Sequence, residues 1–146
     1  MTTRRRLSFQ SLDEIMPEVE QLLKGHAVAG QWTLGQICNH LAGAIRSTAR
    51  PASTVPAATP EQAALKERFF AAGVFPDGRP SPAPFVPSAD LDLAEEVTSL
   101  ARAIERFQNA TGPYPAHPYL GPLSREEWVR FHAMHAAHHL GFAAPL

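Results

Sequence analysis

Cysteine is nearly absent from this 146-residue sequence: Cys38 stands alone, so an intrachain disulfide is excluded. A chain without disulfides fits a reducing compartment, and we expect it in the cytoplasm. Charge of one sign is also missing, because 13 Lys and Arg face 14 Asp and Glu for a net charge of −1. That balance gives no bulk attraction to nucleic acid or to a membrane surface. No apolar run is long enough to span a bilayer.

Two common catalytic signatures are absent as well. The sequence contains no Gly-x-Ser-x-Gly elbow and no alternating strand pattern, which argues against a serine hydrolase. No glycine-rich phosphate loop follows a strand, which argues against nucleotide binding. The basic run Arg4-Arg5-Arg6 has no apolar segment behind it, so it is not an export signal. We expect this run to be a solvated, partly mobile terminus.

What the sequence does contain is helical periodicity. Capping boxes of a Ser or Thr followed three residues later by Glu or Gln mark several helix starts, and apolar residues recur behind them at helical spacing. The pattern predicts no convincing strand, and it predicts helices over residues 11–24, 33–47, 60–72, 91–109 and 124–142. We therefore expect an all-α fold, a four-helix bundle in a single domain spanning residues 1–146. The proline-rich loops 50–60 and 75–87 favour crossover connections over tight turns.

Histidine is concentrated near the end of the chain, where FHAMHAAHHL spans residues 131–140. On a helix, His132, His135 and His139 share one face with the aromatic Trp128, and that face should point inward. A lone inward histidine is usually a hydrogen-bonded core residue, but three on one face need several partners. A metal ion would satisfy several ring nitrogens at once.

The spacing within this stretch suits a metal site. His135 and His139 stand four residues apart, which lets two imidazoles converge on one ion. The candidate for a third ligand is His40, beside the apolar stripe of the second predicted helix, and His132 and His117 are the alternatives. Three nitrogen ligands leave positions open for water or substrate, as in catalytic rather than structural sites. No Asp or Glu lies on the histidine face, so no catalytic acid or base is predicted.

Two segments also carry a family resemblance. WTLGQICNHLAGAI, residues 32–45, and HPYLGPLSREEWVRFHAMHAAHHLGF, residues 117–142, resemble the two signature segments of the DinB/YfiT-like superfamily. The opening RRRLSFQSLDEIMPEVEQLL, residues 4–23, is similar to one branch of it, known only as a domain of unknown function. The resemblance covers nearly the whole chain and is vague over residues 50–90. It implies a four-helix bundle with a crossover.

The resemblance also implies a site. Many members hold a divalent metal through three histidines, which correspond here to His40, His135 and His139, with His138 as a non-ligand between the last two. Imidazole suits Zn, Ni and Fe, so the identity of the ion stays open. Characterised relatives include transferases and isomerases that use low-molecular-weight thiols such as bacillithiol or mycothiol. In those proteins the metal would bind the thiol and lower its pKa.

We therefore expect a small-molecule substrate, a low-molecular-weight thiol, and relatives suggest a homodimer. The alternative is a metal-binding or stress-response bundle without catalysis. His117, His132 and Trp128 are further candidates for groups around the site, with His117 held in a turn near the last helix. For both Trp32 and Trp128 we favour a role in packing, and Cys38 is expected to be a small packed hydrophobe.

Overall fold

The computed structural model describes residues 3–76 and 86–146, and these residues are mostly helical. The chain enters through a 3-10 turn, η1 (Leu12–Glu14). The α-helices that follow are α1 (Ile15–Leu23), α2 (Leu34–Thr48), α3 (Pro60–Ala72), α4 (Leu93–Asn109) and α5 (Arg125–Leu140). Every helix predicted from the sequence is present, with its ends within two residues of those expected, except that the first predicted helix opens with the 3-10 turn η1 and its α-helical part starts only at Ile15. Most of the proline-rich segment 75–87 lies outside the described residues.

The helix starts are set by local side chains. Thr33 and Gln36 form a reciprocal capping box at α2, in which Thr33 Oγ1 accepts from the Gln36 backbone N–H at 3.1 Å. Ser124 and Glu127 do the same at α5. These bonds satisfy backbone N–H groups that have no partner inside the helix. The sequence predicted the starts correctly because the cap and its partner lie within one turn of each other.

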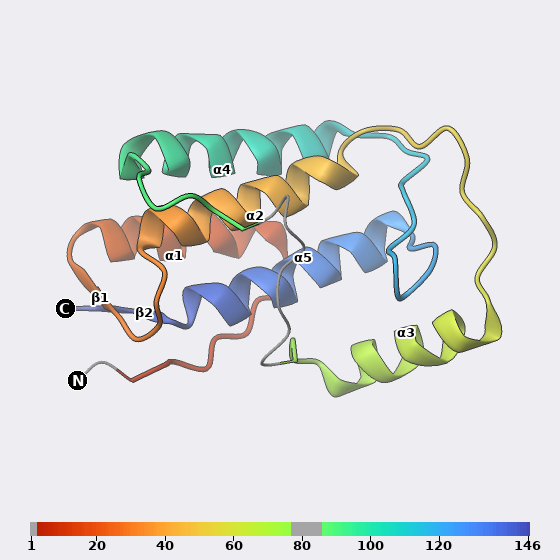
Figure 1. Ribbon diagram of the computed structural model, residues 1–146, viewed down its shortest axis with the longest axis horizontal. Helices are drawn as coiled ribbons and strands as arrows, with labels where there is room; N and C mark the ends of the chain where they lie inside the picture. The colour runs from red at the N-terminus through yellow and green to blue at the C-terminus, as the bar shows by residue number, and fades with distance from the viewer. Residues whose placement is uncertain (1–2, 77–85) are drawn as a thin grey trace.

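The core forms where α1, α2, α4 and α5 meet (Figure 1). α2 and α4 lie side by side and run in the same direction, and α5 contacts both α2 and α1. Each fully buried Leu, Ile or Phe side chain stabilises the fold by about 1.5–3 kcal/mol. Fully buried side chains from the four helices include Leu22, Ile37, Leu41, Leu100, Phe107 and Leu140. α3 contains no fully buried residue, but its partly buried Leu65, Phe69 and Phe70 pack against the outside of this core, where Phe69 stacks on Phe131 of α5.

A short antiparallel ribbon joins the two ends of the fold. β1 (His26–Val28) pairs with β2 (Ala143–Pro145), with His26 opposite Pro145. The prediction that the chain has no strand is therefore wrong at these two places. The strands are only three residues long, too short for an alternating pattern to show in the sequence. The ribbon fixes the end of α1 against the end of α5, the helix with most of the histidines.

The basic run near the N-terminus is held in place, so the expectation of a solvated, partly mobile terminus is wrong for Arg5. Its backbone N–H donates to the Gly141 carbonyl at 2.7 Å, and its Nε donates to the Ala143 carbonyl at 2.8 Å. Its Nη2 also pairs with Glu18 at 3.0 Å. Because these partners lie up to 138 residues away, local sequence could not reveal them.

The middle of α5 is fully enclosed. Every residue from 131 to 137 is buried, including the small Ala133, Ala136 and Ala137. Alanine side chains let neighbouring elements approach closely, so this helix is covered on more faces than the aromatic and histidine face alone. No helix among the described residues is both long enough and apolar enough to cross a membrane.

Candidate metal centre

Three histidines from two helices meet in the interior. His40 projects from α2, and His135 and His139 project from the C-terminal half of α5. One ring nitrogen from each lies within 4.8 Å of the other two. His40 Nε2 and His135 Nε2 are 3.0 Å apart, and the three ring centroids are separated by 4.5–4.8 Å. We call this group the three-histidine cluster.

Burial keeps two members of the cluster, His135 and His139, neutral. Burial lowers the pKa of His135 well below its ordinary value, and the nearby His139 and His40 lower it further. Burial also lowers the pKa of His139 to about 3, with smaller contributions from His40, His138 and Arg4. A neutral imidazole has a lone pair to offer a metal ion, whereas a protonated one has none. At neutral pH these rings are therefore in the form that binds metal.

The spacing of the nitrogens fits one small ion. Two nitrogens bound tetrahedrally to zinc at 2.0–2.1 Å would be separated by about 3.3 Å. The His40 and His135 nitrogens are already 3.0 Å apart, and the nitrogen of His139 lies within 4.8 Å of both. Since His139 is only half-buried while the other two are buried, an additional ligand would approach from its side.

Two aromatic side chains form walls around the cluster. Trp32 stacks on His139 with centroids 5.5 Å apart and lies 5.0 Å from His40. Phe75 covers His135 at 4.8 Å. Trp32 was expected to serve in packing, and because it precedes the N-cap of α2, helical spacing could not place it beside His40. Phe75 was missed, because it lies in a proline-rich segment without periodicity.

The comparison with known families gives one match. A family model described as "Protein of unknown function (DUF1569)" matches residues 1–146. The chain belongs to this family. Neither the curated proteins nor the solved structures yielded a match. The function of this DUF1569 protein must therefore be argued from the site itself.

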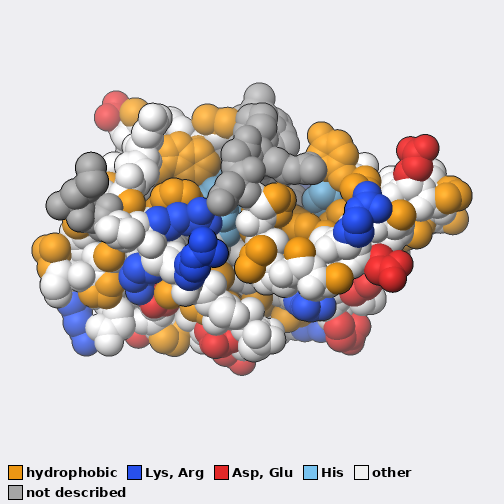
Figure 2. All heavy atoms as spheres, turned by 90° about the horizontal axis from the view of Figure 1, so that it is seen from below, with side chains coloured by type: hydrophobic (Ala, Val, Ile, Leu, Met, Phe, Trp, Pro, Cys, Tyr) orange, Lys and Arg blue, Asp and Glu red, His pale blue; other side chains and the backbone are white. Residues whose placement is uncertain are grey.

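His138 and Arg4 lie at the edge of the cluster in this DUF1569 protein. Arg4 Nη2 donates to His138 Nδ1 at 2.7 Å, and its guanidinium lies 4.5 Å from the centre of the Phe142 ring. His138 is not among the three histidines whose ring nitrogens converge. In Figure 2 histidine side chains reach the surface beside a group of Lys and Arg side chains.

His132, one of the alternatives for the third ligand, is not part of the cluster. Thr48 Oγ1 donates to the Ile45 carbonyl at 2.9 Å and lies 2.8 Å from His132 Nε2. Because the hydroxyl has a single hydrogen, which it gives to Ile45, the second bond is donated by the Nε2–H of the neutral His132 ring. The ring is completely buried, and burial, with a smaller contribution from His117, lowers its pKa to about 3.

His117, the other alternative, also lies outside the cluster. Its Nδ1 accepts from the backbone N–H groups of Tyr119 and Leu120, at 3.0 and 3.2 Å. Its ring packs 5.0 Å from Phe131 and 5.9 Å from Trp128. The predicted turn before α5 is present, and here His117 organises the turn through its own side chain.

Trp128 and Cys38 belong to the core. Trp128 is buried, stacks on His132 and donates its Nε1–H to the Pro115 carbonyl at 3.0 Å. Cys38 is fully buried, and its burial, with a contribution from Glu96, raises the pKa of the thiol to about 12. A thiol with this pKa is not a nucleophile at neutral pH. Both side chains therefore have the packing role expected from the sequence.

Proposed function

We propose that this protein binds a divalent metal ion through His40, His135 and His139. The observation that carries the proposal is the approach of three histidine ring nitrogens to within 4.8 Å of one another. The parallel course of α2 and α4 supports a further part of the proposal, that the fold is a four-helix bundle with crossover connections of the DinB-like kind.

The proposed activity is that of a metal-dependent enzyme acting with a low-molecular-weight thiol. A bound metal would supply Lewis acidity that lowers the pKa of a coordinated thiol. Cys38 cannot serve as an internal nucleophile because it is buried and its pKa is about 12. The thiol would therefore come from solution, past the half-buried His139 and between the walls formed by Trp32 and Phe75.

One observation favours a second function, metal binding without catalysis. The charges that lower the pKa of His135 and His139 are other histidines and Arg4, with no Asp or Glu among them. This surrounding disfavours a reaction that needs a carboxylate acid or base beside either of these two rings.

The first test is metal content, measured by mass spectrometry on tag-free protein prepared without chelator or nickel resin. We expect about one ion per chain in the wild type and close to none in His40→Ala, His135→Ala and His139→Ala. His117→Gln is the matched control and should keep the ion. Circular dichroism of each variant checks that the helices are retained. Equal metal content in folded wild type and cluster variants would contradict the proposal.

A second test separates the enzyme from the binding protein. Cobalt is loaded into the site in place of the native ion, and N-acetylcysteine is added as the probe thiol. A thiolate-to-cobalt charge-transfer band that is absent from His139→Ala would support chemistry with an external thiol. Bound cobalt without such a band would favour the protein that binds metal and does not act on a thiol.

A further inference from the structure

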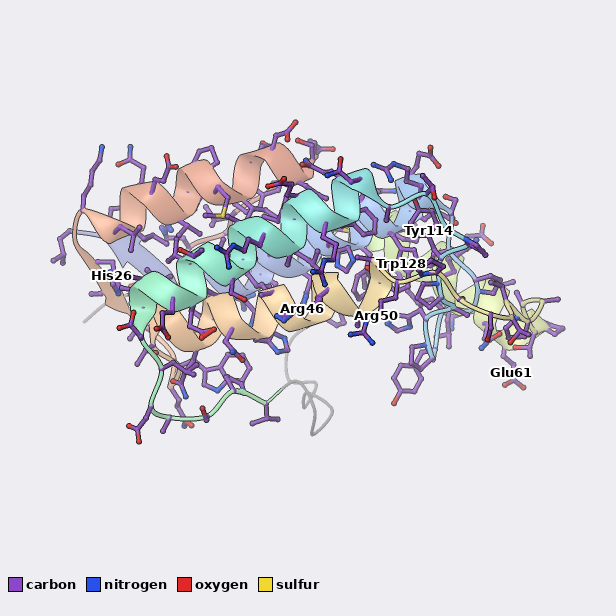
Figure 3. The ribbon with its side chains drawn as sticks, turned by 90° about the horizontal axis from the view of Figure 1, so that it is seen from above. His26, Arg46, Arg50, Glu61, Tyr114 and Trp128 are labelled. Carbon is purple, nitrogen blue, oxygen red and sulfur yellow. The ribbon has the colours of Figure 1, made fainter. Side chains whose placement is uncertain are left out.

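A groove that contains no residue of the three-histidine cluster has no role in the proposed metal site. It lies between α2 and α4 and has a volume of about 460 Å³ (Figure 3). This volume is within the range of small-molecule sites. Ala94 and Ala103 line it, and their small side chains leave space above the contact between the two helices. Larger residues at these positions would fill the groove.

One end of the groove is strongly basic. Arg102 and Arg106 stand one helical turn apart on α4, and Arg46 reaches the same space from the last turn of α2. Within the described part of the chain, no ion pair or side-chain hydrogen bond involves any of these three arginines. The guanidinium groups are therefore available for an anion, on a chain whose net charge is −1.

The other end has a different chemistry. Glu95, Thr98 and Ser99 line it, and Glu95 stands seven residues before Arg102 on the same helix. At 1.5 Å per residue this separates the carboxylate end from the arginine end by about 10 Å along the axis. Hydroxyl and carboxylate groups bind hydroxyls of a ligand, and the carboxylate repels a second anion. The groove thus has a basic end suited to an anion and a second end suited to hydroxyl groups.

We propose that this groove binds a phosphate monoester of a small hydroxylated molecule. Arginine forks match the oxygen atoms of a phosphate group and hold it through paired hydrogen bonds. The lining residues include no aromatic side chain, so a nucleobase would have no ring to stack on. Three arginines on one short groove also fall short of the extended basic surface that a nucleic acid requires.

The test measures binding of glycerol 3-phosphate, inorganic phosphate and glycerol by isothermal titration calorimetry. We expect glycerol 3-phosphate to bind more tightly than inorganic phosphate, and glycerol alone not to bind. Arg46→Gln and Arg102→Gln should each weaken glycerol 3-phosphate binding about tenfold or more, because each removes a charged hydrogen-bond donor. Arg68→Gln, an exposed arginine on α3 outside the groove, is the matched control and should bind as the wild type does.

Several outcomes would overturn the proposal. One is the absence of saturable glycerol 3-phosphate binding at concentrations up to about 10 mM. Another is equal affinity in the wild type, Arg46→Gln and Arg102→Gln, which would mean non-specific attraction. Saturable binding of a polyglutamate peptide in place of glycerol 3-phosphate would assign the groove to an acidic protein segment. Since the altered arginines are remote from the cluster, metal content should stay unchanged in every variant.

Discussion

His132 lies three residues before His135 on the same helix, yet its ring binds a hydroxyl group and not the other histidines. Helical periodicity predicted correctly that His132 and His135 point inward. It could not predict their partners, because Thr48 is 84 residues from His132 and His40 is 95 residues from His135. The Nδ1 atom of His132 is buried and has no hydrogen-bond partner in the described part of the chain.

This burial makes His132 a source of acid sensitivity. Its pKa is about 3 in the folded chain and about 6.5 when unfolded, so between these values only the unfolded state binds the proton. Falling pH therefore favours unfolding, by about 1.4 kcal/mol per pH unit well inside this window. His132→Gln keeps a donor for Thr48 and does not titrate, so we expect a shallower loss of stability with acid. Urea unfolding at pH 4, 5 and 7, with chelator present, measures it.

Between pH 7 and the ordinary histidine pKa, the stabilities of the wild type and His132→Gln should change with pH in parallel, which provides an internal control. The free energies of unfolding should diverge only below about pH 6. Profiles that stay parallel down to pH 4 would show that His132 is not buried in its neutral form.

At the scale of elements, helices were easier to predict than the segments that join them. A capping box such as Ser124 with Glu127 acts within one turn, so the local sequence contains both partners. The β1–β2 ribbon and the hydrogen bonds that hold Arg5 depend on partners at the other end of the chain. Gly141 shows the same dependence, because a Cβ atom there would overlap the backbone carbonyl oxygen of Arg5.

Gly141→Ala tests this contact. The backbone of Gly141 has φ −61°, which alanine adopts without strain, so the main source of a loss of stability is the overlap with Arg5. We expect the substitution to lower the free energy of unfolding by about 1–3 kcal/mol. In a chain lacking residues 1–6 the same substitution should be neutral or slightly stabilising. Urea denaturation of the four proteins measures this coupling, and an equal loss in both backgrounds would contradict it.

At the scale of the whole molecule, the cluster joins two helices that are distant in sequence. His135 and His139 could be proposed from their spacing, and His40 was chosen from its place beside an apolar stripe and from the family resemblance. Trp32 and Phe75, which surround the cluster, could not be assigned because their contacts arise only when α2, α5 and the segment after α3 pack together. A metal bound here would connect α2 to α5 and would oppose their separation.

If a metal ion connects α2 to α5 in this way, its binding should stabilise the entire fold. A ligand that binds only the folded state at 100 times its dissociation constant adds about 2.7 kcal/mol. For a chain of this length that corresponds to a rise in Tm of about 5–10 °C. Calorimetry of metal-free protein, with and without added Zn²⁺ at neutral pH, measures the rise. His135→Ala should show no rise, whereas His117→Gln should match the wild type. A similar rise in His135→Ala would place the ion elsewhere, since that chain lacks one of the three nitrogens.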